Sequence, residues 1–170
     1  YADKRFAARA EDLRHFIQNH RERYDAIYIN GAGIMLFFFP LTFITQEDFL
    51  YSAESYKTLF DNMLTENGVL FAERGSHLVR EAYEWGGSLP DDVHMRIFWM
   101  KATDYPLAGM TLTYMFASRD EAKLDRIAKE LAIGNVFKEI PYQPELRKKY
   151  FDNRPFMQPG VTLGLMGLTL

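Results

Sequence analysis

The chain has 170 residues, of which 48% are hydrophobic and 25% charged, a composition typical of one globular domain with a single core. The net charge of -3 and the scattered basic residues give no support to nucleic-acid binding. Cysteine is absent, which excludes disulfides, a thiolate nucleophile and cysteine-ligated zinc, and fits a reducing, cytoplasm-facing location.

The first part of the chain alternates strand and helix patterns. Residues 5–10 can form a short strand, and the apolar spacing within 12–20 predicts a helix. Residues 24–30 predict a buried strand. The apolar segment 31–45 follows, and its proline argues against one continuous helix or a central strand there.

A second helix is predicted to begin after Ser52, a good N-cap, with Glu54 in its first turn. Its apolar positions recur at spacings of three and four residues: Tyr56, Leu59, Phe60 and Met63. Asn67 and Gly68 are expected to end this unit as a turn before a buried strand over 69–73. Strand, helix and strand together form a crossover unit, which predicts two parallel strands.

The second half of the chain predicts a helix over 76–85 and then two strands over 93–100 and 110–118. Because Pro106 and Gly109 lie between these strands, we expect an antiparallel hairpin.

Ser118 and Glu121 have the pattern of a capping box, which predicts the start of another helix. Its inward positions are Leu124, Ile127, Ala128 and Leu131. Prolines keep the chain irregular beyond Ile140. The uncharged segment 160–170 is too short to cross a bilayer by itself, so it is either the start of a membrane helix or a terminal element docked on the core.

Four segments, in this order along the chain, carry a resemblance to a known family. They are 24–29 (YDAIYI), 45–56 (TQEDFLYSAESY), 64–70 (LTENGVL) and 152–156 (DNRPF). They resemble the YDVI strand, the TENYLYT-x-E-x-F segment, the L-x-P-x-GVL turn and the DDRPF signature of spermidine synthase-like proteins, a branch of the S-adenosylmethionine-dependent methyltransferase fold. The resemblance covers only the C-terminal half of that fold.

The resemblance implies an α/β fold, a three-layer, Rossmann-like, methyltransferase-type half sheet that is mostly parallel with one antiparallel hairpin strand. Its strands would be the fourth to seventh of the complete fold, with the hairpin strand between the fifth and sixth. Residues 1–150 would form this partial domain, and 151–170 an irregular tail leading into the apolar segment. The strands that hold S-adenosylmethionine would lie in an N-terminal cofactor half outside this sequence.

At the end of the strand over 24–30, aminopropyl transferases of this family need a carboxylate that takes a proton from the attacking amine. This chain has Asn30, and an amide does not act as a base near neutral pH. Asn30 is a candidate for catalysis and for cofactor binding. Gly31 would let the backbone approach the cofactor, or it forms an ordinary flexible turn. Glu73 and Arg74, at the end of the next strand, are interpreted as a surface ion pair.

Three more residues are candidate site residues through the resemblance. Glu11 and Asp12 follow the strand over 5–10, where the family places an acidic pair near the adenine of the cofactor; alternatively, their charge favours the start of a helix. Tyr51 would face the site, or it packs in the core at the start of the second helix. The histidines show no metal-ligand spacing, so no metal is predicted.

These observations predict two functions. In the first, the chain is a spermidine synthase-like transferase domain that moves a methyl or aminopropyl group from S-adenosylmethionine or decarboxylated S-adenosylmethionine to a small amine, only with its cofactor half attached. In the second, it is a non-catalytic module that binds a membrane or a partner protein. We expect a location at the cytoplasmic side of a membrane. We also expect a homodimer through the exposed edge strand over 5–10, unless an N-terminal segment completes the sheet.

Overall fold

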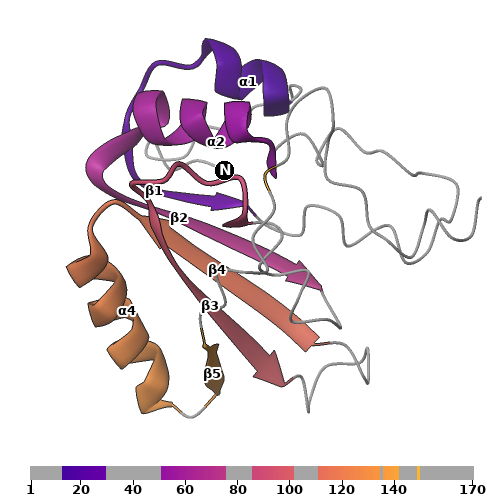
Figure 1. Cartoon of the computed structure of the whole chain (residues 1–170), viewed down its shortest axis with the longest axis vertical. Helices are drawn as coiled ribbons and strands as arrows, with labels where there is room; N and C mark the ends of the chain where they lie inside the picture. Colours follow the sequence, from indigo (N-terminus) through magenta and orange to yellow (C-terminus); the bar gives the residue numbers. More distant parts are fainter. Residues whose placement is uncertain are drawn as a thin grey trace, which may run out of the picture.

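The structure is a computed structural model that describes residues 13–29, 51–75, 86–101, 111–134, 136–141 and 149. These residues form an α/β arrangement, a mixed open sheet of five strands with helices against it (Figure 1). The predicted α/β class is therefore confirmed for the described part of the chain.

Five strands build the sheet in the spatial order β1, β2, β4, β3, β5. Their bounds are β1 (Tyr24–Ile29), β2 (Leu64–Gly75), β3 (His94–Lys101), β4 (Thr111–Ser118) and β5 (Phe137–Ile140). β1 and β2 are parallel, whereas β4 runs antiparallel to both β2 and β3, and β5 runs antiparallel to β3. β4, the predicted hairpin strand, thus lies antiparallel between β2 and β3 as predicted. The sheet as a whole is mixed, since β1 and β2 are the one parallel pair of neighbours among the described strands.

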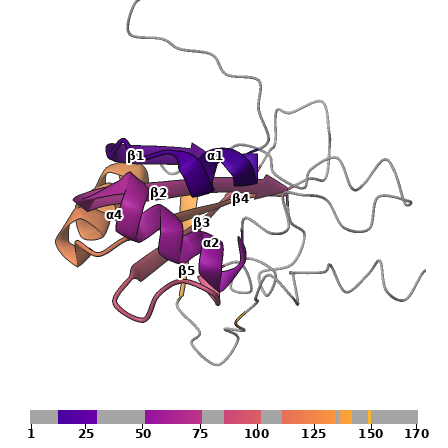
Figure 2. The same cartoon turned by 90° about the horizontal axis from the view of Figure 1, so that it is seen from above.

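One face of the sheet carries the larger core, covered by helices from the first half of the chain. They are α1 (Leu13–Asn19), α2 (Ala53–Thr58) and the π-helical turn η3 (Leu59–Met63) that continues α2. Figures 1 and 2 show α1 and α2 side by side, and Figure 1 shows both at a distance from the last helix of the chain. The predicted apolar face of the second helix is buried, at 0–2% exposure: Tyr56, Leu59, Phe60 and Met63. It packs in one cluster with Leu70, Ala72, Met115 and Ala117 of the strands.

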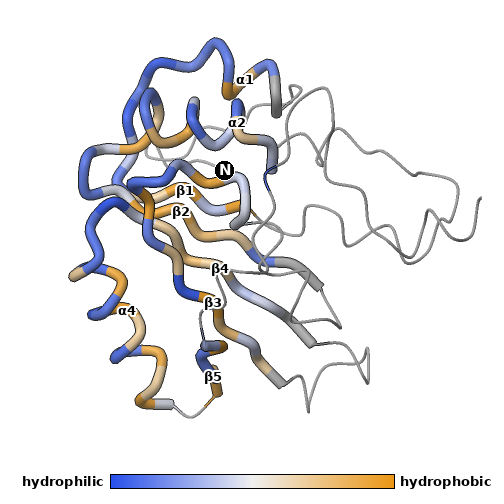
Figure 3. Tube along the Cα trace, viewed as in Figure 1, coloured by the Kyte–Doolittle hydropathy of each residue, from blue (hydrophilic) through white to orange (hydrophobic). Residues whose placement is uncertain are grey.

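The opposite face is covered in part by α4 (Glu121–Ile133), which contacts β3, β4 and β5. Figure 3 shows polar and apolar residues alternating along α4, as expected for a helix that packs one side on the sheet and exposes the other. Apolar residues run along parts of β2 and β4. Leu124 is the buried residue of α4, and Asp125 forms an ion pair with Arg96 of β3. α4 therefore lies mainly over β3, β4 and β5, and it reaches β2 through Lys123, whose Nζ donates to the Asn67 carbonyl at 2.6 Å.

Two predicted boundaries are wrong. β2 begins at Leu64, so Asn67 and Gly68 lie inside a strand and form no turn at its start. The register explains this, because Tyr24 pairs with Leu64 but Ala26 pairs with Val69, leaving extra residues on β2 in a bulge.

The capping box is the other wrong boundary. Asp120, and not Ser118, is the N-cap of α4, and its carboxylate accepts a hydrogen bond from the Lys123 amide at 2.9 Å. Ser118 is still the last residue of β4, and its buried hydroxyl donates to the Gly68 carbonyl at 2.8 Å. The same oxygen accepts a hydrogen bond from the Asp120 amide at 3.1 Å, so Ser118 joins β2 to the residue before the helix and does not cap the helix itself. Ser52, in contrast, is confirmed as the N-cap of α2.

Several predictions fall outside the described residues: the strand over 5–10, the helix over 76–85, the turn at Pro106 and Gly109, the DNRPF segment and the apolar segment 160–170. β5 is an element that the sequence patterns did not predict. In the described ranges, no helix has the length and apolar character needed to cross a membrane.

The bulge in β2 predicts that Gly68→Ala destabilises the fold by about 1–3 kcal/mol. An added Cβ would lie 2.9 Å from both the Leu64 side chain and the Thr65 carbonyl oxygen, and the backbone oxygen has little room to shift. Chemical denaturation measures the free energy of unfolding. The control is Gly134→Ala, where the Cβ would meet Val136 at an ordinary 3.7 Å. Equal stability of the two variants would contradict the close packing at Gly68.

Candidate functional site

The candidate site lies at the carboxyl ends of β1 and β2, where parallel α/β sheets gather ligands. Ile29, the last residue of β1, pairs with Ala72, and this register places Glu73 at the same edge. The Tyr28 hydroxyl donates a hydrogen bond across the two strands to the Glu73 carboxylate. Tyr28 and Glu73 are thus two polar groups that the fold, and not the local sequence, brings together.

Tyr28 also ends a row of stacked rings on the face of the sheet that α4 partly covers. We call Tyr28, Phe71 and Phe116 the aromatic row. Their ring centroids are 4.6 Å and 4.5 Å apart, with interplanar angles of 12° and 11°. Since successive cross-strand rings cover each other, Phe71 occupies the ring face of Tyr28 that looks toward β2. The other ring face looks out over the edge of β1, and Tyr28 is 50% exposed.

The electrostatics of this pair keep the phenol protonated. Partial burial, followed by the hydrogen bond to the Glu73 carboxylate, raises the pKa of Tyr28 to about 12, because both disfavour the phenolate. Tyr28 is therefore a hydrogen-bond donor at neutral pH. Within the described residues, the Glu73 carboxylate accepts its hydrogen bond from this neutral hydroxyl.

The structure describes one of the candidate residues predicted from the sequence. Tyr51 is 1% exposed and lies edge-on to Tyr56, with ring centroids 6.3 Å apart. This burial matches the interpretation of Tyr51 as a core residue, and a contact with ligand stays a prediction. Asn30 and Gly31, with Glu11 and Asp12, lie outside the described residues.

Sequence reasoning missed the Tyr28–Glu73 pair. Glu73 was interpreted as one half of a surface ion pair with Arg74, whose side chain lies outside the described part. The crossover unit places the end of β2 beside the end of β1, where Tyr28 lies. This signal was available, but it needs the register of β1 against β2, which the bulge at Gly68 shifts.

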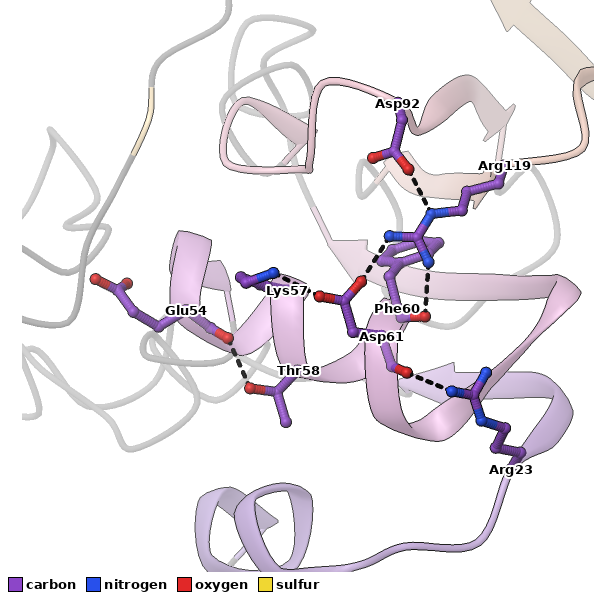
Figure 4. Close-up of polar contacts among 8 residues, drawn as sticks. All are labelled: Arg23, Glu54, Lys57, Thr58, Phe60, Asp61, Asp92 and Arg119. Atoms are coloured by element: carbon purple, nitrogen blue, oxygen red, sulfur yellow. Dashed lines mark hydrogen bonds and ion pairs between the residues drawn. The ribbon is translucent and has the colours of Figure 1, made fainter.

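A second polar cluster lies at the opposite ends of these strands, near the start of β1 and β2 and the end of β4 (Figure 4). Arg119, directly after β4, donates from Nε to Asp92 at 2.6 Å, from Nη2 to Asp61 at 2.7 Å and from Nη1 to the Phe60 carbonyl at 2.9 Å. Asp61 also forms an ion pair with Lys57 at 2.6 Å. Hydrogen bonds from Lys57, then from Arg119, hold the pKa of Asp61 below its ordinary value of 3.8.

Arg23 completes this cluster from the start of β1. Its guanidinium donates to the Asp61 carbonyl at 2.7 Å and the Leu64 carbonyl at 3.2 Å. Carbonyls at a helix end have no partner within the helix, and cationic side chains satisfy them. The cluster therefore ties the end of η3 to β1 and to β4, and its groups bond to one another. We interpret it as structural.

The described residues contain no group of three or more histidine, aspartate or glutamate side chains that could hold a metal ion. His20 stacks on Phe16 and Tyr24, with centroids 4.3 Å and 5.5 Å away, and its Nε2 lies 2.6 Å from the Tyr24 hydroxyl. This histidine joins α1 to β1.

Comparisons of the chain with known protein families, with curated proteins and with solved structures each return no match.

The structural cluster predicts that Arg119→Ala lowers the free energy of unfolding by about 2–3 kcal/mol, since it removes charged hydrogen bonds to Asp61, Asp92 and a helix-end carbonyl. Chemical denaturation measures this loss. The control Arg126→Ala removes an exposed ion pair of 3.8 Å with Asp120 and should cost below about 1 kcal/mol. Similar losses in both variants would contradict the role of Arg119.

The same cluster predicts a pH dependence. Because the folded-state pKa of Asp61 is lowered, its contribution to stability is present above the unfolded value near 3.8 and is lost as the pH falls through the folded value. Asp61→Asn should flatten the stability profile below about pH 4. An unchanged slope in that window would show that other carboxyls cause the acid instability.

For the Tyr28–Glu73 pair, we expect Glu73→Gln to lower the pKa of Tyr28 from about 12 toward 10.0, because the carboxylate charge is removed. The wild-type protein should lose stability as the pH rises from the unfolded to the folded pKa, and the variant should lose less. NMR of ¹³C-labelled tyrosine follows the titration, and Tyr28→Phe assigns the resonance. A Tyr28 pKa that stays unchanged in the variant would contradict the hydrogen bond.

Proposed function

We propose that this chain is the distal half of a spermidine synthase-like transferase domain, which works with S-adenosylmethionine or decarboxylated S-adenosylmethionine. The strand order carries this proposal. Taken as the fourth to seventh strands of the complete fold, β1, β2, β3 and β4 have the predicted neighbours, with the last strand antiparallel between the fifth and sixth. The resemblance of the four sequence segments supports the same assignment.

The residues that the structure describes do not form a cofactor site by themselves. The described residues include no glycine-rich strand–helix turn for the methionine part of S-adenosylmethionine, and the Glu11–Asp12 pair proposed for the adenine lies outside them. We therefore derive no transfer step from this chain. In the proposal, a cofactor-binding half supplies this site and joins the sheet at β1, the edge strand of the described sheet.

A small amine is the proposed acceptor substrate, and its site would lie at the carboxyl ends of β1 and β2. Asn30 can donate or accept a hydrogen bond there but cannot take the proton. Asn30 also supports the second candidate function, a non-catalytic module that kept the scaffold and binds a partner protein or a membrane. Among the described strands, β1 pairs on one side only, and this supports a protein partner in particular, since unpaired strand edges pair with other chains.

Calorimetric titration of this chain joined to its cofactor half tests the first proposal. We expect heat of binding with S-adenosylmethionine or decarboxylated S-adenosylmethionine, and we expect Asn30→Asp to raise transfer to putrescine, since it restores the carboxylate. A variant in which Ser52 is replaced by Ala should bind the cofactor as before, because this N-cap lies in the core. The absence of binding heat would favour the non-catalytic module.

A further inference from the structure

β1 is the edge strand among the described strands of the sheet. In the described sheet β1 pairs with β2 on one side only, so its outer backbone donors and acceptors face away from the other strands. Ile29 on one face is buried in the core, whereas Ala26 and Tyr28 on the other face are exposed. Beside an added strand, the face of the sheet with Ile29 would therefore be occupied by the core, and the face with Tyr28 would be exposed.

On the exposed face of β1, one ring face of Tyr28 is available for a further contact. Phe71 stacks on the inner ring face of Tyr28 at 4.6 Å, so the aromatic row can grow outward only over the outer ring face. A residue directly opposite Tyr28 on a neighbouring strand would have its Cβ about 4.5–5.5 Å from the Cβ of Tyr28. A planar or long side chain at that position would cover the ring.

The charge of Glu73 narrows the choice of that side chain. Three other half-buried carboxylates of the described residues each form an ion pair with lysine or arginine: Asp61, Asp120 and Asp125. Glu73 is half-buried too, yet its described partner is the neutral Tyr28 hydroxyl. A partly buried carboxylate gains most from a cation, because the low dielectric strengthens their attraction.

We propose that the outer edge of β1 binds a β-strand of the cofactor-binding half that carries an arginine opposite Tyr28. The guanidinium stacks on the outer ring face of Tyr28 and donates hydrogen bonds to the Glu73 carboxylate. Arginine fits both contacts, because it is planar, stacks on aromatic rings and bonds carboxylates in pairs, whereas lysine is a compact point charge. This inference rests on the proposed function, since the strand is the one by which the cofactor half would join the sheet.

The test titrates the whole 170-residue chain with a short acetylated peptide of alternating threonine and valine around one central arginine. NMR should show slowed amide exchange in β1 and shifts of the Tyr28 ring. Glu73→Gln should weaken peptide binding about tenfold, the loss of a charge-assisted hydrogen bond. The control Asp25→Asn removes an exposed carboxylate of the same strand, on the other face, and should leave binding unchanged.

Three results would overturn the inference: equal binding of a peptide with a central glutamate, equal binding by Glu73→Gln, or shifts at Tyr28 and Glu73 caused by putrescine in place of the peptide. The source of the strand has its own test, because the chain joined to its cofactor half should no longer bind the peptide. If that protein binds S-adenosylmethionine and still binds the peptide, the strand does not come from the cofactor half. If the isolated chain binds the arginine peptide but the joined protein binds no cofactor, the surface stands and the proposed function fails.

Discussion

The junction at the end of β4 is the contact on which the described fold depends most. β4 lies between β2 and β3, so the β1–β2 pair and the β3–β5 pair share a sheet only through this strand. At its end the buried Ser118 hydroxyl bonds the Gly68 carbonyl, and the next residue, Arg119, bonds Asp61, Asp92 and the Phe60 carbonyl. One short segment therefore sets the position of the bulge, the end of η3 and the entry to β3. Because the groups are partly buried and charged, removing one would leave its partners without compensation.

This junction has consequences at the other ends of β1 and β2. With the bulge held at Gly68, the register of β2 against β1 places Phe71 beside Tyr28, and Glu73 directly after the partner of Ile29, the last residue of β1. One face of the sheet is then closed by α1, α2 and η3 over a common core. The other face carries the aromatic row, whose outer end at Tyr28 is 50% exposed. The structural cluster and the candidate site thus lie at opposite ends of the same strands, and the register connects them.

Sequence reasoning succeeded where local physics decides the outcome. The buried face of α2 follows from apolar spacing, and the Ser52 cap follows from its side chain and the helix dipole. The strands β1, β3 and β4 follow from short apolar runs. The order of the strands was predicted from the resemblance to a family, because spacing alone fixes no neighbours in a sheet.

The failures share one cause, which is that tertiary contacts outweighed a local signal. Asn67 and Gly68 have strong turn chemistry, yet the packing of Leu64 against Gly68 keeps them within β2. Ser118 has the side chain of an N-cap, yet its hydroxyl donates to the Gly68 carbonyl of β2 and accepts from the Asp120 amide, and Asp120 caps the helix. The Tyr28–Glu73 pair joins residues 45 positions apart in the sequence, so no local pattern indicates it.

Under the proposed function, β1 would be an internal strand of a larger transferase sheet whose other half binds the cofactor. Hydrogen exchange at the amides of residues 24–29 tests it most directly, in the 170-residue chain and in the chain joined to its cofactor half. The outward-facing amides of β1 should exchange fast in the first protein and slowly in the second, while those bonded to β2 stay slow in both. Equal exchange of the outward-facing amides in the two proteins would contradict the claim and leave β1 as a true edge.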